Sequence, residues 1–205
     1  MLNEGVIQYR LQQVTQALPA TLAVDALEAC RARLFAQHLI GQDPARYEGL
    51  GYGNVSVRAA LADNPNAFLI TGSQTGHLPR LQRQHYALVT ACDAQANELH
   101  ALGEISPSSE AMTHAVIYPI SSQIQAIIHV HSADLWQNAQ RLKLPCTAAD
   151  IPYGTPQMAA AVQNIVLTQG APCGILAMLG HTDGIVTWGQ TLAEAEQQLM
   201  QSFIF

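Results

Sequence analysis

Short runs of apolar residues, several of them alternating with polar residues, recur along the chain and predict the strands of a sheet. These runs cover residues 54–58, 67–71, 85–92, 127–132, 173–179 and 185–188. An Asp-Gly pair at 183–184 separates the last two runs and favours a hairpin. Segment 93–97 is predicted to turn the third run into another hairpin. We therefore expect most strands to pair antiparallel.

The stretches between these runs predict helices. Their ranges are 6–17, 21–41, 108–118, 133–142, 155–168 and 191–203. Gly41 is expected to end the second helix, while serines cap the third, Thr155 the fifth and Thr191 the last. Helices that segregate from mainly antiparallel strands predict a layered α/β/α fold, with a central sheet flanked by helices. Because the 205 residues contain no repeat or linker, we expect one domain over residues 1–205.

The run 127–132 carries two histidines at alternate positions, His129 and His131. Residues two apart in a strand point to the same side, so both imidazoles share one face while Ile128 and Val130 pack on the other. Two imidazoles close together can bind one metal ion. The alternative is that both rings are core residues bonded to backbone. We favour metal ligation, which requires at least one further ligand and usually a general base.

Two glycine-rich segments are candidates for binding a ligand through the backbone. The connector 49–54 ends at Asn54, and its glycines allow a close approach of the main chain to a ligand. The turn 72–76, which contains Thr75 and Gly76, can present N–H groups to an anion. The alternative for both segments is a plain loop or turn.

A helix start at Ser108 and Ser109 is a further candidate anion site, because the first turn of a helix has free N–H groups and a positive dipole end. Glu110 follows, and His114 lies four residues later on the same face. The structural alternative for Glu110 is a favourable charge at the helix N-terminus. The alternative for His114 is a hydrogen-bonded residue on the inner face.

Composition narrows the classes of partner. The net charge is −6, and no basic run or basic-aromatic pattern is present, which argues against nucleic acid. The uncharged stretch 151–180 is broken by Pro and Gly, so we expect no membrane span, and the N-terminus lacks the pattern of a signal peptide. Four dispersed cysteines suggest reduced thiols in a cytoplasmic protein. Only 12% of residues are charged, which suggests that other subunits cover part of the surface.

Several short motifs follow one another along the chain. They are Gly53-Asn54-Val55-Ser56-Val57-Arg58, a Thr-Gly pair at 71–72 or 75–76, Ser108-Ser109-Glu110 with His114, His129-Val130-His131, and a histidine close to the last Gly-apolar strand. In this order they resemble the class II aldolase/adducin N-terminal domain family. The resemblance extends from about residue 31 to the C-terminus.

The resemblance implies a mainly antiparallel sheet between helices, a divalent metal that is usually Zn²⁺, and often a homotetramer. It implies His129, His131 and a third histidine as metal ligands and Glu110 as the catalytic acid or base. Asn54, Thr75, Gly76, Ser108 and Ser109 would hold a phosphate or carboxylate. We therefore expect a carbon–carbon lyase that acts on a small phosphorylated or acidic carbohydrate through a metal-stabilised enediolate. The alternatives are a dehydratase or epimerase of the same family, or a non-catalytic adducin-like interaction domain.

Two departures from the family pattern bear on these expectations. A gapless match puts Asp183 where the family has its third histidine, and His181 lies two residues earlier. We favour His181 as the ligand, because a third imidazole suits zinc and Asp-Gly suits the turn. Family aldolases also use a tyrosine from a neighbouring subunit, in the loop after the His-x-His strand. Segment 144–149 has no tyrosine, and Tyr153 matches a different position, so this loop does not supply the acid that family aldolases use for the aldehyde product.

Overall fold

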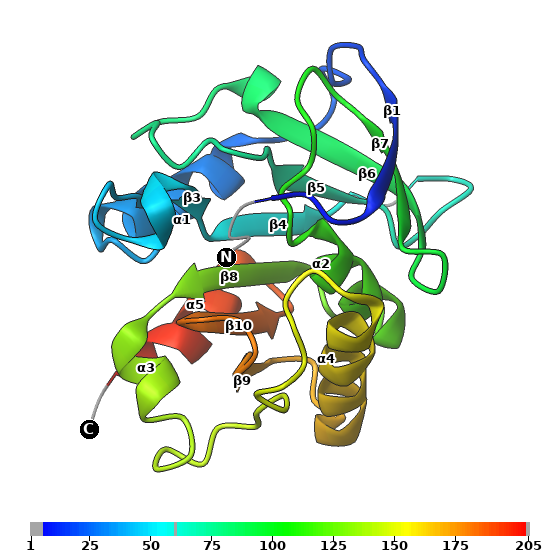
Figure 1. Ribbon diagram of the computed structural model, residues 1–205. Helices are drawn as coiled ribbons and strands as arrows, with labels where there is room; N and C mark the ends of the chain where they lie inside the picture. The colour runs from blue at the N-terminus through cyan, green and yellow to red at the C-terminus, as the bar shows by residue number, and fades with distance from the viewer. Residues whose placement is uncertain (1–5, 60, 204–205) are drawn as a thin grey trace.

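A mixed sheet of eight strands forms the centre of the computed structural model, which describes residues 6–59 and 61–203 (Figure 1). The strand order is β1-β7-β6-β5-β4-β8-β10-β9, and β2 and β3 form a separate pair. The strands are β1 (Arg10–Val14), β2 (Gly41–Gln42), β3 (Gly51–Tyr52), β4 (Asn54–Arg58), β5 (Phe68–Thr71), β6 (Tyr86–Asp93), β7 (Glu98–Leu102), β8 (Ala126–His131), β9 (Gly174–Ala177) and β10 (Gly184–Gly189). Every neighbouring pair is antiparallel except β1 and β7.

Helices cover both faces of the sheet. They are α1 (Asp25–Ala36), α2 (Ala111–Ile117), α3 (Ala133–Gln137), α4 (Pro156–Gln169) and α5 (Leu192–Gln201), with short 3-10 turns η1 (Tyr47–Gly49), η2 (Arg83–His85) and η3 (Tyr118–Ile120). The predicted α/β/α layering and the mainly antiparallel sheet are confirmed. Within the described residues, none of the helices has the length and hydrophobicity to cross a bilayer.

Two hydrophobic cores follow from the alternation of side chains along the strands. Ile127 of β8 packs with α2 and α4 on one face, whereas Ile128 and Val130 pack with α1 and α5 on the other. His129 and His131 therefore project on the α2 and α4 side, as their spacing predicts. Because β4 pairs with β8 so that Asn54 lies opposite His129, the side chains of these two residues share that face.

Three local predictions were wrong. Residues 6–17 contain no helix, because Arg10–Val14 pairs in parallel with β7 at the sheet edge, where tertiary pairing overrides local propensity. The first helix, α1, spans only Asp25–Ala36, and Gly41 begins β2 instead of ending the helix. The helix predicted over 133–142 stops at Gln137.

Two of the predicted helix caps are present, and one is not. Thr155 and Thr191 accept hydrogen bonds from the backbone N–H groups of Met158 and Glu194, as predicted. The cap position of α2 belongs to Glu110, whose side chain makes no capping bond, so the serine cap expected there is absent. Ser108 instead accepts a long contact of 3.4 Å from the Glu110 N–H.

Candidate metal centre and anion pocket

Three buried histidines meet at the C-terminal end of β8. His129 and His131 lie on the strand itself, and His181 lies in the turn between β9 and β10. Because β10 pairs with β8 so that Gly184 lies opposite His131, the turn is held next to both rings. One ligand atom from each histidine lies within 4.8 Å of the others. This histidine cluster (His129, His131 and His181) can hold a single metal ion.

The hydrogen bonding of His129 fits a metal ligand. Its Nδ1 atom lies 3.1 Å from the carbonyl oxygen of Ile185, an acceptor, so Nδ1 carries the proton. Its Nε2 atom is then a lone-pair donor, and it is buried with no hydrogen-bond partner among the described residues. A buried polar atom without a partner is costly. A metal ion bound at Nε2 would satisfy it, and the hydrogen bond to the carbonyl would fix the orientation of the ring.

Burial also keeps the cluster in its ligating form. Desolvation lowers the pKa of His129 and of His131 well below the ordinary value for histidine, and the neighbouring rings lower both further. Both imidazoles are therefore neutral near pH 7, and a neutral imidazole is the form that binds metal.

The turn 178–184 is shaped around the His181 ring. A Cβ atom added at Gly184 would lie 3.1 Å from both Cγ and Nδ1 of His181, so a side chain there would require the ring to shift by a few tenths of an ångström. A backbone hydrogen bond closes this turn: the Met178 N–H donates to the Gly184 carbonyl at 2.9 Å. Gly184 therefore leaves space for the imidazole within the hairpin.

Asp183 lies outside the histidine cluster. Its φ of 64° is left-handed, which Asp tolerates in a turn. Its Oδ2 atom accepts a hydrogen bond of 2.5 Å from the Tyr47 hydroxyl and lies 3.7 Å from the Arg46 guanidinium. The structure thus gathers His181, and not Asp183, with His129 and His131. Asp183 joins the turn to the loop that contains Tyr47.

Aromatic rings surround the cluster, and this wall was not predicted from the sequence. The ring centroids of Tyr47 and Tyr52 lie 4.7 and 5.4 Å from that of His131, and the ring centroid of Tyr153 lies 4.6 Å from that of His181. Tyr47 has a φ of 50°, a left-handed conformation unusual for an aromatic residue. Nothing in the local sequence marks that conformation, so its position against His131 is visible only in the fold.

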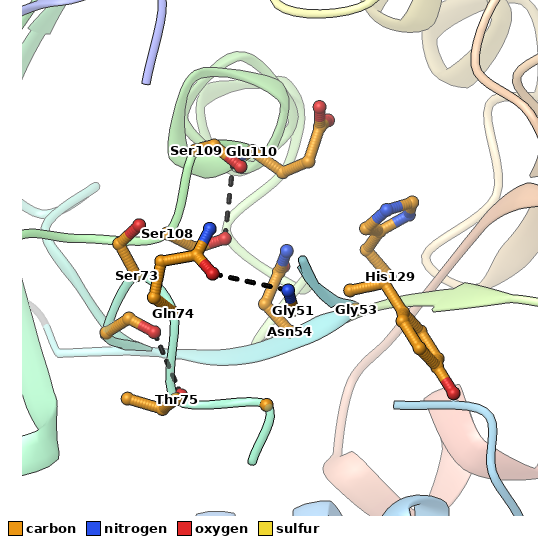
Figure 2. Close-up of a pocket in the computed structure, with 13 residues that line it drawn as sticks. Gly51, Gly53, Asn54, Ser73, Gln74, Thr75, Ser108, Ser109, Glu110 and His129 are labelled. Atoms are coloured by element: carbon orange, nitrogen blue, oxygen red, sulfur yellow. Dashed lines mark hydrogen bonds between the residues drawn. The ribbon is translucent and has the colours of Figure 1, made fainter. Parts of the chain in front are cut away.

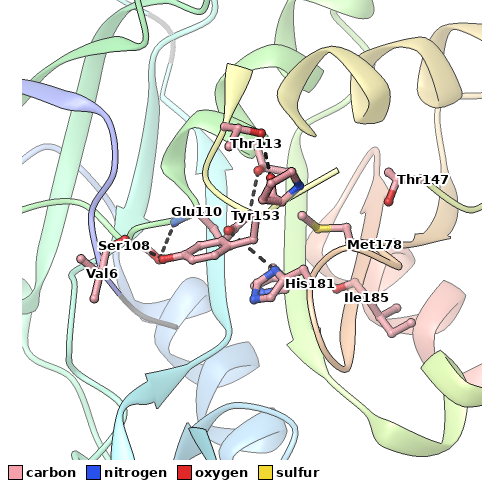
Figure 3. A network of polar contacts seen from close by, with 12 residues as sticks. Val6, Ser108, Glu110, Thr113, Thr147, Tyr153, Met178, His181 and Ile185 are labelled. Atoms are coloured by element: carbon pink, nitrogen blue, oxygen red, sulfur yellow. Dashed lines mark hydrogen bonds and ion pairs between the residues drawn. The ribbon is translucent and has the colours of Figure 1, made fainter. Parts of the chain in front are cut away.

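Glu110 lies beside the cluster, 2% exposed, at the start of α2. Its Oε1 atom is 3.7 Å from Nδ1 of His181, and its Oε2 atom accepts a hydrogen bond of 2.7 Å from the Thr113 hydroxyl. Figure 3 shows Glu110, Tyr153 and His181 converging from three separate segments. A carboxylate so placed can exchange a proton with a molecule bound next to the histidines.

A polar pocket adjoins Glu110 and His129 (Figure 2). We call it the anion pocket; it is lined by Gly51, Tyr52, Gly53, Asn54, Gly72, Ser73, Gln74, Thr75, Gly76, Ser108, Ser109, Glu110 and His129. The structure thus brings together all five residues predicted to bind an anion, from three distant segments. The sequence had not singled out Ser73 and Gln74 as individual residues. No Lys or Arg side chain lines the pocket in the part of the chain that the structure describes.

Asn54 presents its amide to the pocket. The side chain is 3% exposed, and its Oδ1 atom has no hydrogen-bond partner among residues 6–59 and 61–203. Because amide O and N are assigned from their surroundings, either end can face a ligand. Figure 2 shows the amide rising from β4 between Gln74 and His129. A ligand in the pocket would provide the missing partner.

Tyr9 supports the helix start that forms one wall of the pocket. Its buried hydroxyl lies 3.0 Å from the carbonyl oxygens of Pro107 and of Ser108. The same N-terminal segment accepts a hydrogen bond of 2.5 Å at the Val6 carbonyl from the Tyr153 hydroxyl. Sequence reasoning missed both tyrosine contacts, because it assigned this segment to a helix.

His114 lies outside the pocket lining and in the core. Its Nδ1 atom and the Tyr118 hydroxyl are each 2.7 Å from the Ser56 hydroxyl. Burial lowers the pKa of His114 to about 3. The interpretation of His114 as a hydrogen-bonded inner-face residue agrees with these contacts.

Residues 45–201, more than half of the chain, match the model of the class II aldolase and adducin N-terminal domain. The chain belongs to this family. The matched range contains every histidine of the cluster and every residue that lines the anion pocket. Tyr9 and α1 lie before it.

Solved structures of the family share the fold. An L-fuculose 1-phosphate aldolase is 19% identical, with a TM-score of 0.64 over 91% of this chain and 84% of that one. The L-fuculose-1-phosphate aldolase of Thermus thermophilus is 22% identical, with a TM-score of 0.59 over 86% and 87%. YgbL of Klebsiella pneumoniae, assigned only provisionally among aldolase, epimerase and decarboxylase, is 20% identical, with a TM-score of 0.59 over 85% and 82%. Identities this low establish the common fold alone.

Proposed function

We propose that this chain is a metal-dependent carbon–carbon lyase that acts on a small phosphorylated or acidic carbohydrate. The observation that carries the proposal is that the histidine cluster and the anion pocket lie next to each other. Glu110 and His129 line the anion pocket, and both also lie at the histidine cluster. A small substrate with its anionic group in the pocket would therefore have its reacting carbons beside Glu110 and the histidines.

The residues present fit a divalent metal, and we propose Zn²⁺ held by His129, His131 and His181. Three imidazoles, of which those of His129 and His131 are neutral, match the donor set of a catalytic zinc site, in which three protein ligands leave the fourth position to water or substrate. When bound, such an ion polarises a substrate oxygen and stabilises the negative charge that develops on it.

Glu110 is the residue that we propose moves the substrate proton. The Thr113 hydroxyl donates to Oε2 and fixes the direction of the carboxylate. Ser108, Ser109, Asn54 and the 72–76 turn would hold the anionic group, so that the carbon to be deprotonated stays within reach of the carboxylate. This positioning needs no basic side chain at the pocket surface.

The tyrosines favour a second candidate, a dehydratase or epimerase that uses the same carboxylate. Aldol cleavage needs an acid for the aldehyde product, and the nearby hydroxyls donate elsewhere. Tyr47 donates to Asp183, Tyr52 to the His38 carbonyl at 3.4 Å, and Tyr153 to Val6. The substrate proton could still be moved by Glu110 without cleavage.

A substrate screen tests the function and separates the two candidates. The zinc-loaded protein is incubated with small ketose phosphates and sugar acids, and the products are analysed for aldehyde, for loss of water and for epimers. Aldehyde release supports the lyase, whereas water loss or epimers support the second candidate.

Equal metal content in wild type and the His129→Ala/His131→Ala double variant, purified alike, would contradict the metal site. Phosphate soaked into crystals should appear in the anion pocket.

We also propose a homotetramer, with the sites lying between subunits. The small proportion of charged residues, 12%, supports an extensive covered surface. Light scattering should give about four times the chain mass of 22.1 kDa. A stable monomer at micromolar concentration would exclude it.

A further inference from the structure

A buried arginine lies behind the anion pocket. Arg31 of α1 is 1% exposed, and its guanidinium packs over the Phe35 ring at 4.7 Å. It donates to two backbone carbonyls of the 75–78 turn: Nη1 to Leu78, and Nη2 to Thr75 at 3.1 Å. Among the described residues no carboxylate pairs directly with it. Burial lowers the pKa of Arg31, and Glu28 on the same helix partly offsets this.

The buried charge needs an explanation beyond the two carbonyls. A neutral donor could satisfy these oxygens, and a cation removed from water is expensive unless an anion compensates it. Glu28 supplies part of that compensation, but its carboxylate also accepts the Tyr86 hydroxyl at 2.9 Å and lies 3.9 Å from Arg80. The positive charge of Arg31 is therefore only partly compensated, and it can also act on an anion on the pocket side of the 75–78 turn.

The peptide group between Thr75 and Gly76 connects Arg31 to the pocket. In a planar trans peptide the C=O and N–H groups point in opposite directions. The Thr75 carbonyl points to Arg31, so the Gly76 N–H points away from it. No described residue accepts a hydrogen bond from this N–H, and a Cβ added at Gly51 would lie only 3.3 Å from the Gly76 nitrogen. Both glycines line the anion pocket.

We propose that Arg31 is a positioning residue for anion recognition: it orients and polarises the Thr75–Gly76 peptide so that the Gly76 N–H donates to a phosphate or carboxylate of the substrate. The inference rests on the proposed function of the pocket. A donor polarised by a cation makes a stronger hydrogen bond to an anion. A pocket lined without Lys or Arg would thus draw on a positive charge one layer below its surface.

Two substitutions separate charge from hydrogen bonding. Arg31→Lys keeps the charge and N–H donors, whereas Arg31→Gln keeps N–H donors and removes the charge. Inorganic phosphate binding to each zinc-loaded protein is measured by titration calorimetry. We expect the Kd to rise about tenfold for Arg31→Gln, which equals about 1.4 kcal/mol, and to stay within about threefold of wild type for Arg31→Lys.

Arg58→Gln is the matched control. Arg58 also donates to backbone carbonyls, including those of Ile124 at 2.9 Å and Tyr118 at 2.7 Å, but neither residue lines the pocket. It should lower the melting temperature without changing the phosphate Kd. Equal Kd values for wild type and Arg31→Gln, or equal losses for Lys and Gln, would overturn the role of the charge. If wild type itself bound no phosphate, the proposed function of the pocket would fail first.

A second measurement needs no variant. Labelling with ¹⁵N-glycine gives signals from the 14 glycines, of which Gly76 can be assigned. On phosphate titration the Gly76 amide proton should move downfield and saturate with the calorimetric Kd. Saturable phosphate binding with an unmoved Gly76 signal would overturn the inference while leaving the pocket intact.

Discussion

The histidine cluster and the anion pocket are adjacent, but they are built in opposite ways. The cluster is made of side chains whose chemistry is visible in the sequence, and its rings are held by strand pairing and a tight hairpin. The pocket combines glycines, hydroxyls and main-chain groups with the amides of Asn54 and Gln74, and its lining comes from four segments, 51–54, 72–76, 108–110 and His129. Its binding capacity depends on backbone orientation, which residues behind it control. Spacing along one strand therefore already places two cluster histidines together, whereas the predicted pocket residues lie in separate segments that only the fold brings together.

Glu110 lies at the boundary of the two regions, and its substitution should have the largest effect. Glu110→Gln keeps the size of the side chain and a hydrogen-bond acceptor for Thr113 but cannot take up a proton. We expect the turnover rate to fall on the order of a hundredfold or more, with metal content and phosphate affinity near those of wild type. Unchanged turnover on the identified substrate would reject the role.

The next test addresses the cluster alone and compares His181→Ala with Asp183→Asn. Removing a ligand should weaken zinc binding by more than about a hundredfold, as measured by competition with a chelator. Asn tolerates the left-handed φ of 64° and can still accept the Tyr47 hydroxyl, so Asp183→Asn should cost less than about tenfold. The opposite order would show that Asp183 is the ligand and His181 is not.

The difference between these two residues also shows how far the sequence could be interpreted. Alternation in 127–132 correctly placed His129 and His131 on one face. The structure brings His181 next to them and leaves Asp183 outside the cluster, while the choice of His181 as the ligand stays a prediction. The motif order gave the layered sheet. These successes share a cause, since each depends on the chemistry or the period of neighbouring residues.

The failures depend on contacts between distant segments. Residues 10–14 form a strand because β7 offers an edge for pairing, and nothing local in that stretch signals it. Tyr47 and Tyr153 reach the cluster through a left-handed loop and a long connection. Arg31 resembles any helical arginine until the turn 75–78 is placed against it.

The stability of the metal-free protein in acid should further distinguish the histidine cluster from the anion pocket, because the buried histidines are concentrated on the cluster side. The pKa values of His114, His129 and His131 are lowered, so the unfolded chain binds more protons than the folded chain below about pH 6.5. Stability should therefore be lost as the pH falls from 6.5 toward 3. Each histidine contributes up to about 1.4 kcal/mol per pH unit in that window.

Denaturant unfolding at a series of pH values, in the presence of a chelator, measures this slope. His129→Gln should flatten it relative to wild type. His77→Gln is the control, because His77 is exposed and its ring hydrogen-bonds to the Gln74 carbonyl at 3.2 Å, away from the cluster. The same slope for wild type and His129→Gln would show that burial of this ring does not set the acid limit.

The smallest expected effect tests whether the pocket depends on groups behind its surface. Tyr9→Phe removes the hydroxyl shared by the carbonyls of Pro107 and Ser108 but keeps the buried ring. Because those carbonyls orient the start of α2, the change should weaken phosphate binding about threefold and lower stability by about 1 kcal/mol. Zinc affinity should not change, since the Tyr9 hydroxyl bonds to the helix start and not to a ring of the cluster. Tyr153→Phe, which loses its bond to Val6 beside His181, is the matched variant on the cluster side. A loss of zinc affinity in Tyr9→Phe equal to its loss of phosphate affinity would mean that the two regions respond as one unit.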